Sequence, residues 1–539
     1  MDLSRADHSV SPPRIEVPRT YNAAHDLLER NLHSGRGSKL AYVDDRGRYT
    51  YAELASRVNR TANALTEELG LHAEQRVVLA LLDGIDFPTV FLGAIKAGIV
   101  PIAVNTLLTA TDYRYILNDS RAAAVIVSAP LLSVVEEAMQ GGGRIFVKEV
   151  IVSGDSDSRY RHLSDLLRSA DEACEAASTT ADDPCFWLYS SGSTGAPKGT
   201  VHVHASMIQT AELYARPVLG IREDDVVFSA AKLFFAYGLG NSLSFPLSVG
   251  ATSVLMAERP TPAAVFKRLT EHRPTIFYGV PTLYAAMLAA PDFPSRDKLA
   301  LRRCASAGEP LPAEIGRRFH ERTGVDILDG IGSTEMLHIF LSNAPDGVRY
   351  GTTGVPVPGY EVRIVDEQGK DVPDGEPGEL LIRGPTAAMT YWNNRPKSRA
   401  TFLGEWTRSG DKYRRDESGY YVYCGRNDDM LKVGGIWVSP AEVEAAIITH
   451  PAVLEAAVVG WEDEERLVKP KAFVVLRDNG RGSAALASEI QEHVRQRLAH
   501  YKYPRQIEFV VELPKTATGK IQRFKLRQRQ SVKTAGSIG

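Results

Sequence analysis

The most informative segment of the sequence is Y-S-S-G-S-T-G-A-P-K-G, residues 189–199, which follows the apolar run Phe186 to Tyr189. Its three glycines offer bare backbone N–H groups, its serines and threonine offer rotating donors, and Lys198 offers a point charge. Together these groups can wrap a polyphosphate. On composition alone, a flexible surface turn is an equally good interpretation.

This segment is not a Walker loop. The pattern G-x-x-x-x-G-K-[ST] fails, because Pro197 precedes Lys198 and Gly199 follows it. A proline also disfavours helical backbone at the residue before it, here Ala196. We therefore predict a loop that does not run straight into a helix.

The N-terminal part of the chain shows β-α-β units. Thr50 to Glu53 reads as a capping box and starts a helix. The apolar runs Arg76 to Leu82 and Ile99 to Val104 flank a predicted helix, Phe87 to Ala97. Similar strand-like runs are 124–127, 186–189, 226–229 and 275–278. These features predict an α/β fold with largely buried parallel strands.

The pattern changes towards the C-terminus. Glycine and proline punctuate a β-rich stretch from Gly351 to Gly384, whereas Ser439-Pro-Ala-Glu442 begins a fresh helix after Gly425. Strand-like runs at 456–459, 471–476 and 507–511 and a helix at 484–498 follow. We predict a large N-terminal domain of β-α-β units with a β-rich subdomain, residues 1–427, and a smaller, mobile α+β C-terminal domain, residues 428–539.

Composition excludes several classes. The 539 residues carry 63 Lys+Arg against 66 Asp+Glu, for a net charge of -3, which excludes a basic nucleic-acid coat. The cysteines form no C-x-x-C pair, so neither a disulfide framework nor a metal knuckle is expected. We find no signal peptide and no apolar run of about 18 residues. We expect a cytoplasmic protein without nucleic-acid or membrane partners, and either a monomer or a homodimer.

Ser190 to Gly199 resembles the phosphate loop of the acyl-adenylate-forming superfamily of acyl- and aryl-CoA synthetases. Further segments match in order: 232–238 (K-L-F-F-A-Y-G), 306–310 (S-A-G-E-P), 332–335 (G-S-T-E), 409–411 (S-G-D) through 425–428 (G-R-N-D), and 514–520 (P-K-T-A-T-G-K). Within the superfamily the chain is most similar to benzoate and 4-hydroxybenzoate CoA ligases, through 232–241 and 329–340.

The resemblance implies a two-step ligation with ATP, Mg²⁺ and coenzyme A. ATP converts an aromatic carboxylate to an acyl-AMP with loss of pyrophosphate, and the thiol of CoA then displaces AMP, as in aromatic degradation. One alternative is a module that loads a separate carrier protein, which would have to act in trans because little chain follows the last motif. Another is a nucleotide-binding regulator without catalysis.

The resemblance also assigns the nucleotide site. Lys520 bridges the carboxylate and the α-phosphate, Thr334 faces the phosphates and Glu335 binds the metal. The alternatives are a solvated lysine and a helix N-terminal acid. Asp411 and Arg426 hold the ribose hydroxyls, unless they form only a surface ion pair. The implied ATP- and AMP-binding residues are Ser190, Ser191, Gly192, Ser193, Thr194, Gly195, Lys198, Gly308, Glu309, Pro310, Asp329, Gly330, Ile331, Asp411 and Arg426.

The acid site is predicted to be a flat slot between aromatic rings beside flexible Gly238 and Gly240. Phe235 occupies a position where many relatives carry histidine, and Ile331 one where many carry a stacking aromatic. The implied substrate-binding residues are Phe235, Ala236, Tyr237, Ala307, Gly332, His338, Ile339 and Lys432. Each aromatic has a plain core residue as its alternative, and a lone histidine is more often structural.

The remaining assignments concern the thiol and the domain motion. The resemblance implies a CoA tunnel along Gly434, Gly435 and Trp437 and a hinge at Asp428. His202 and His204 point to one face of a strand, but no third ligand lies nearby in sequence, so we assign them no metal.

Overall fold

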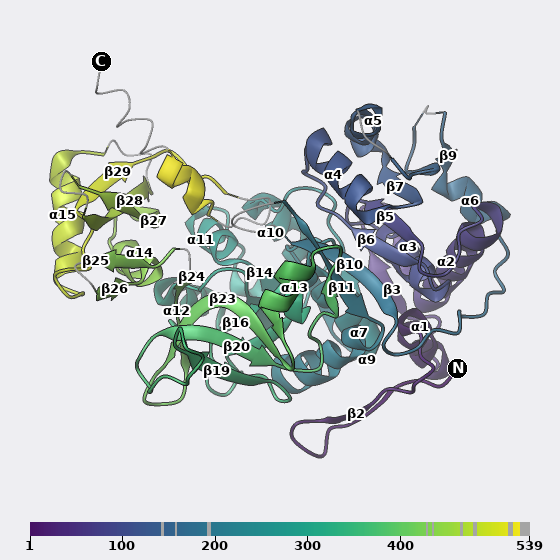
Figure 1. Cartoon of the computed structure of the whole chain (residues 1–539), viewed down its shortest axis with the longest axis horizontal. Helices are drawn as coiled ribbons and strands as arrows, with labels where there is room; N and C mark the ends of the chain where they lie inside the picture. The colour runs from purple at the N-terminus through teal and green to yellow at the C-terminus, as the bar shows by residue number, and fades with distance from the viewer. Residues whose placement is uncertain are drawn as a thin grey trace.

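The computed structural model describes residues 1–141, 145–156, 159–190, 196–426, 429–433, 436–463, 467–477, 482–515 and 521–528, with the side chains of residues 432, 436 and 437 left out. Figure 1 shows β25 to β29 with α14 and α15 at one end of the molecule, beside β23 and β24. Helices α2 to α6 lie at the opposite end. Among the described residues, no helix combines the length and apolar character needed to span a membrane.

The first large sheet belongs to the N-terminal part. Its described strands, in spatial order, are β21 (Thr390–Tyr391), β11 (Lys198–Val203), β10 (Pro184–Ser190), β6 (Val100–Ala103), β5 (Arg76–Ala80), β7 (Ala124–Ser128), β8 (Glu149–Ser153) and β9 (Arg161–His162). The strands from β10 to β9 are parallel, whereas β11 and β21 add antiparallel at one edge.

The second large sheet runs β18 (Val355–Pro356), β17 (Ile339–Ser342), β16 (Ile327–Gly332), β15 (Arg303–Ser306), β14 (Ile276–Gly279), β12 (Val226–Ser229), β13 (Thr252–Val254), β3 (Leu40–Val43) and β4 (Arg48–Thr50). Its central strands are parallel. Side chains alternate between two cores, because Ile276 and Tyr278 pack on one face and Phe277 on the other. The predicted α/β body with buried parallel strands is confirmed.

Helices cover both sheets. They are α1 (Ala23–His33), α2 (Tyr51–Asn63), α3 (Asp86–Lys96), α4 (Ala110–Ser120), α5 (Leu132–Gln140), α6 (Leu163–Ser169), α7 (Ala205–Thr210), α8 (Ala236–Leu239), α9 (Phe245–Val249), α10 (Pro262–Glu271), α11 (Pro281–Ala289), α12 (Ala313–Thr323) and α13 (Arg395–Thr401). The predicted capping box is confirmed at the start of α2, where the Thr50 side chain accepts from the backbone N–H of Glu53 and the Glu53 side chain reaches back.

The β-rich subdomain is a third sheet. It contains β19 (Glu361–Val365), β20 (Gly378–Arg383), β23 (Trp406–Arg415), β22 (Phe402–Leu403) and β24 (Tyr421–Arg426). It follows the second sheet in the chain, and its apolar residues join the core cluster that contains β16 and β17. The ends of β23 and β24 therefore lie on the same body as those strands.

The small C-terminal part has its own core. It contains β25 (Leu431–Val433), β26 (Ile436–Val438), α14 (Pro440–Ile448), β27 (Val453–Glu462), β28 (Val468–Leu476), α15 (Ala484–Arg495) and β29 (Gln506–Phe509). The Ser439 side chain caps α14 by accepting from the Glu442 N–H, as the S-P-A-E pattern predicts. The α+β character of this part is confirmed.

Candidate functional site

The predicted phosphate loop connects two antiparallel strands. β10 ends at Ser190 and β11 begins at Lys198, and these two residues face each other in the ladder. This confirms that the loop does not run into a helix. Tyr115 on α4 donates a hydrogen bond of 3.0 Å to the Pro197 carbonyl and so ties the end of the loop to the body. Ser191 to Gly195 lie outside the described residues.

Lys198 lies over an aromatic ring that the sequence interpretation did not include. Its Nζ is 4.7 Å from the centroid of the Tyr391 ring. Burial lowers the pKa of Lys198, and the attraction of the Glu335 carboxylate opposes that shift. A partly desolvated cation is therefore held beside a carboxylate, which suits binding of an anionic ligand.

Glu335 lies on a short helical turn after β16. The turn is η6 (Thr334–Met336), and the Ser333 side chain caps it. Tyr391 Oη donates to Glu335 Oε1 at 2.7 Å, and Ser190 Oγ donates more weakly to the same oxygen at 3.4 Å. Because η6 spans three residues, its dipole is small, and stabilising a helix N-terminus does not account for this carboxylate.

The backbone of this turn is anchored from several directions. Ala388 N donates to Glu335 O at 2.7 Å, and Thr386 Oγ1 donates to Met336 O at 2.7 Å. His202 Nε2 contacts Thr334 O at 2.7 Å and must carry the proton, because its partner is an acceptor. Burial lowers the pKa of His202 to about 4, so the ring donates as a neutral imidazole.

The second histidine of the β11 pair has a separate structural partner. His204 Nδ1 accepts from Ala23 N at 3.1 Å, at the start of α1. Burial lowers the pKa of His204 to about 4 as well. Each histidine thus bonds to backbone, and within the described residues no cluster of three or more His, Cys, Asp and Glu side chains could hold a metal.

Asp411 and Arg426 face each other across β23 and β24. Arg426 Nη1 donates to Asp411 Oδ1 at 3.1 Å, and the Asp411 carboxylate raises the pKa of Arg426. Gly410 has φ +76, and Arg426 Nη2 lies 3.2 Å from where a Cβ would be, so a larger residue would crowd the guanidinium. In this ion pair the Asp411 side chain is 9% exposed and the Arg426 side chain is 47% exposed, so the carboxylate is buried while the guanidinium reaches the surface.

The predicted adenine turn contacts the C-terminal part. Gly308 adopts φ +97, and Glu309 Oε1 accepts from Ile521 N at 2.8 Å. Ile521 directly follows Lys520, which lies outside the described residues. The residue that follows the predicted catalytic lysine therefore bonds to this turn. Pro310 follows the turn in sequence.

Asp329, Gly330 and Ile331 lie on β16 next to this turn. Burial raises the pKa of Asp329 well above its usual range, although Leu311 N donates to its carboxylate at 3.3 Å. Ile331 packs against the apolar core and presents no ring for stacking. β16 thus places three predicted nucleotide residues near its carboxyl end, and the chain then leads directly to Glu335.

The aryl region, which we define by Tyr237, His338 and Ile339, combines two rings with one aliphatic side chain; His338 and Ile339 are buried and Tyr237 is partly buried. His338 Nε2 contacts the Tyr237 carbonyl at 3.2 Å, and the two rings are 5.5 Å apart. Tyr214 and Phe245 also pack on the His338 ring, at 5.6 and 4.5 Å. Burial lowers the pKa of His338 to about 3, so it is neutral. These contacts are also those of a structural core histidine, so both interpretations of His338 agree with the structure.

The glycines near this region have a different role from the one expected. Gly240 lies in η4 (Gly240–Ser244), a π-helical turn between α8 and α9, and a Cβ there would overlap the His338 ring. Gly238 likewise packs against backbone, since a Cβ would overlap Lys232 O. The structure gives both glycines a packing reason, because neighbours approach too closely for a Cβ.

The predicted acid-site residues do not all form one cluster. Ala307 and Ile339 share a core cluster with the partly buried Tyr237. Phe235 instead lies against Phe234, with tilted rings whose centroids are 4.3 Å apart, and packs with Ala236 against the core of the first sheet. Gly332 pairs with Ile339 at a β-bulge. The segment 234–237 therefore spans two cores and joins the two large sheets.

Some predicted residues fall outside the described part of the chain. These are Ser191, Gly192, Ser193, Thr194, Gly195, Asp428, Gly434, Gly435 and Lys520, together with the side chains of Lys432 and Trp437. Their assignments stay predictions.

The described residues fit a hard divalent cation beside a nucleotide. Such a cation takes one or two carboxylates plus phosphate oxygens, and Glu335 offers one carboxylate that is already oriented by hydrogen bonds. Thr334 adds a hydroxyl next to it. This donor set suits Mg²⁺ better than a softer metal, which would need histidine or cysteine ligands.

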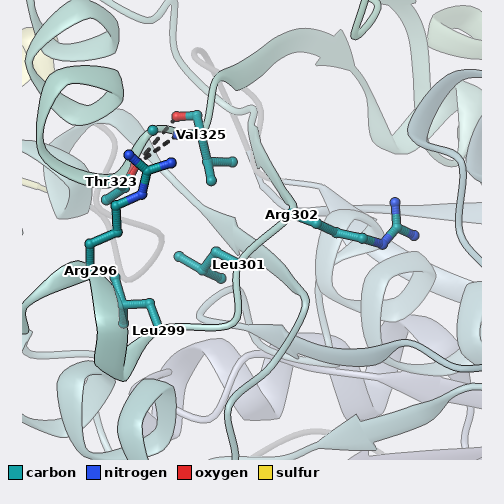
Figure 2. Close-up of a pocket in the computed structure, with 7 residues that line it drawn as sticks. Arg296, Leu299, Leu301, Arg302, Thr323 and Val325 are labelled. Carbon is teal, nitrogen blue, oxygen red and sulfur yellow. Dashed lines mark hydrogen bonds between the residues drawn. The ribbon is translucent and has the colours of Figure 1, made fainter.

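A pocket of about 260 Å³ lies elsewhere (Figure 2). It is lined by Arg296, Leu299, Leu301, Arg302, Thr323, Gly324 and Val325. Figure 2 shows Thr323 and Val325 hydrogen-bonded to each other, with the Arg302 side chain extending away from Leu301. These residues precede β15 and β16, whereas ligands of parallel sheets bind at the carboxyl ends of strands. We do not assign this pocket to the site.

Two residues that organise the site were not predicted as site residues. Tyr391 reaches Glu335 from a sequence distance of 56 residues, and His202 reaches Thr334 across 132 residues. The only local signal was strand alternation, which placed His202 and His204 on one face of a strand. It did not identify Thr334 as the partner of His202. For Tyr391 the sequence offered no such signal, because β11 brings it into place.

Comparison with known proteins agrees with this geometry. A family model described as AMP-binding enzyme matches residues 28–392, and one described as AMP-binding enzyme C-terminal domain matches residues 442–520. The benzoate–CoA ligase of Thauera aromatica is 63% identical over 97% of this chain and 99% of its own.

Two further proteins are similar over nearly the whole chain. The 4-hydroxybenzoate–CoA/benzoate–CoA ligase of Rhodopseudomonas palustris is 51% identical over 95% of this chain and 94% of its own. The crystal structure of a benzoate CoA ligase from Burkholderia xenovorans LB400 aligns with a TM-score of 0.89 at 57% identity, over 94% of this chain and 100% of that one. With a large N-terminal and a smaller C-terminal domain, the chain belongs to the AMP-binding enzyme family.

Proposed function

We propose that the protein is an ATP-dependent aryl-CoA ligase that activates benzoate, with 4-hydroxybenzoate as a second substrate, and transfers the aryl group to coenzyme A. The observation that carries this proposal is the short segment from Gly332 to Ile339. It places the carboxylate of Glu335 and the buried, neutral ring of His338 three residues apart. A charged nucleotide site and an uncharged aromatic site therefore adjoin. The names of the relatives support the same chemistry.

In the first step, a carboxylate oxygen of the acid attacks the α-phosphorus of ATP. The new P–O bond forms as the bond to pyrophosphate breaks, and negative charge grows at phosphorus. We assign Lys520 to this charge and Lys198 to the other phosphates. Asp411 holds the ribose hydroxyls, and Arg426 orients the Asp411 carboxylate by donating to it. A bound Mg²⁺, held by Glu335, would supply further charge neutralisation.

In the second step, the CoA sulfur attacks the carbonyl carbon of the aryl-AMP. The C–S bond forms, the C–O bond breaks with release of AMP, and the thiol proton passes to water. We propose that residues 428–539 turn about Asp428 between the steps, which replaces the Lys520 segment by 432–437. Gly434, Gly435 and Trp437 would then line the thiol path, and Lys432 would reach the carbonyl group of the aryl-AMP, which derives from the carboxylate of the acid. The contact of Ile521 with Glu309 supports the first orientation.

The aryl region supports a flat, uncharged ring as the preferred group. Ala307 and Ile339 share one buried cluster with the partly buried Tyr237 packed against it, and burial keeps His338 neutral while the Tyr237 carbonyl holds its ring in place. Such a surface gains by contact with a ring and offers no full charge to a second carboxylate. We propose a cytoplasmic enzyme, since four free thiols suit a reducing compartment.

The test is pyrophosphate release with ATP and benzoate, followed by CoA. We expect release with benzoate and, on adding CoA, formation of benzoyl-CoA and AMP. Benzoyl-AMP that forms but does not react with CoA would instead favour a module that loads a separate carrier protein. Failure to release pyrophosphate with every aromatic acid would refute the adenylating function.

A further inference from the structure

Tyr391 contacts two functional motifs that lie far apart in sequence. Its Oη donates to Glu335 Oε1 at 2.7 Å, and its ring face receives Lys198 Nζ at 4.7 Å from the centroid. The residue is 3% exposed. One buried side chain therefore lies against both the cation that ends the phosphate loop and the carboxylate assigned to the metal.

Backbone contacts set the position of Tyr391, and its side chain contacts Glu335 and Lys198. β21 pairs with β11, so Tyr391 faces Thr200, two residues after Lys198. The backbone N–H of Tyr391 donates to Ser398 Oγ at 3.1 Å, and Phe402 packs on the ring at 5.2 Å. These contacts fix where the phenol can reach, and it reaches Glu335.

The Glu335 backbone does not need Tyr391. Ala388, His202 and Thr386 already bond the three carbonyls of the turn, at residues 335, 334 and 336. What Tyr391 adds is the direction of the carboxylate. Both hydrogen bonds that the described residues make to this group end on Oε1, and the one from Tyr391 is much the shorter. A carboxylate held by one oxygen presents the other in a fixed direction.

We propose that Tyr391 is a positioning residue for the metal–nucleotide complex: its phenol orients Glu335 towards a divalent cation, and its ring seats Lys198 beside the same phosphates. This assignment rests on the proposed adenylating function. Partners that orient a metal ligand typically change metal affinity by about 10- to 100-fold when removed. Removing the Tyr391 hydroxyl should therefore weaken metal binding while leaving the seat of Lys198 in place.

The test measures binding rather than turnover. Mn²⁺ binding to the full-length protein with α,β-methylene-ATP is followed by the electron paramagnetic resonance of free Mn²⁺. For Tyr391→Phe we expect about 10-fold weaker Mn²⁺ binding, while the affinity for the same nucleotide in EDTA stays at the wild-type value. For Tyr391→Leu, which also removes the ring, we expect the affinity in EDTA to fall by about 2- to 5-fold.

The matched control is Tyr350→Phe, which removes a hydroxyl bonded to the Asp326 carboxylate at 2.6 Å. It should leave both affinities unchanged. Wild-type Mn²⁺ affinity in Tyr391→Phe would overturn the proposal, as would an equal loss of affinity for Mn²⁺ and for metal-free nucleotide, since that indicates a purely structural role. If the wild type itself bound no Mn²⁺–nucleotide, the proposed function would fall as well.

Discussion

The nucleotide region, which we define by Lys198, Glu335, Asp411 and Arg426, and the aryl region of this protein are held in place by different interactions. Lys198, Glu335 and Arg426 are charged and partly exposed, and each is held by a ring, a hydroxyl or an opposite charge. Tyr237 and His338 are held mainly by ring packing and burial. A charged side chain needs a hydrogen-bond or ion-pair partner to hold its orientation, whereas a ring is held by the shape of the surface on which it packs. Damage to the first region should therefore reduce rate, and damage to the second should reduce selectivity.

The largest expected effect concerns Lys520, the lysine that we assign to the α-phosphate. Lys520→Ala should slow adenylation by at least about 10²- to 10³-fold, which is the usual cost of losing one electrostatic donor to a transition state. The attack of CoA on supplied benzoyl-AMP should stay within several-fold of wild type. Both half-reactions can be measured separately by pyrophosphate release and thioester formation.

The paired variant reverses that pattern. Asp428→Pro restricts one backbone dihedral at the proposed hinge, so it should spare adenylation and slow thioester formation. Equal damage to both half-reactions in both variants would mean one static active site. The proposed rotation of residues 428–539 would then be abandoned.

A smaller effect is expected in the aryl region. Tyr237→Ala removes a ring that packs on His338 and Tyr278, at 5.5 and 6.3 Å. Discrimination between benzoate and a short aliphatic acid, measured as a ratio of kcat/KM values, should fall by about 1–3 kcal/mol.

The control for that loss is Phe293→Ala, which deletes a buried ring from the other face of the second sheet. It should lower stability and leave the ratio unchanged. If Tyr237→Ala kept the wild-type ratio, Tyr237 would be a core residue alone.

The smallest effect concerns pH and the histidine that ties β11 to α1. His204 has a pKa of about 4 in the fold, against about 6.5 when unfolded. Between these values the unfolded chain binds the extra proton, so stability falls as pH falls. His204→Asn keeps an acceptor for Ala23 N but cannot titrate. Between pH 7 and 5.5 the wild type should lose about 1 kcal/mol more stability than this variant, measured by urea unfolding. Equal losses would show that His204 is not neutral in the fold.

Features that depend on residues close in sequence could be predicted from the sequence, whereas contacts between distant segments could not. The caps at Thr50 and Ser439 depend on residues three positions away, so they could be predicted. The Asp411–Arg426 pair was identified by motif order alone. By contrast, the partners of Tyr391 and His202 depend on strand pairing between distant segments. The separation of Phe235 from Tyr237 into two cores depends on how the large sheets meet.

The most direct test of the division between the two regions is the ratio of kcat/KM for benzoate to that for decanoate, measured by pyrophosphate release in the wild-type protein. Both acids present the same carboxylate to the nucleotide region and differ only in what they present to Tyr237, His338 and Ile339. We expect benzoate to be favoured by about 100-fold or more, which is a large discrimination for a hydrophobic pocket. Comparable values for the two acids would contradict it.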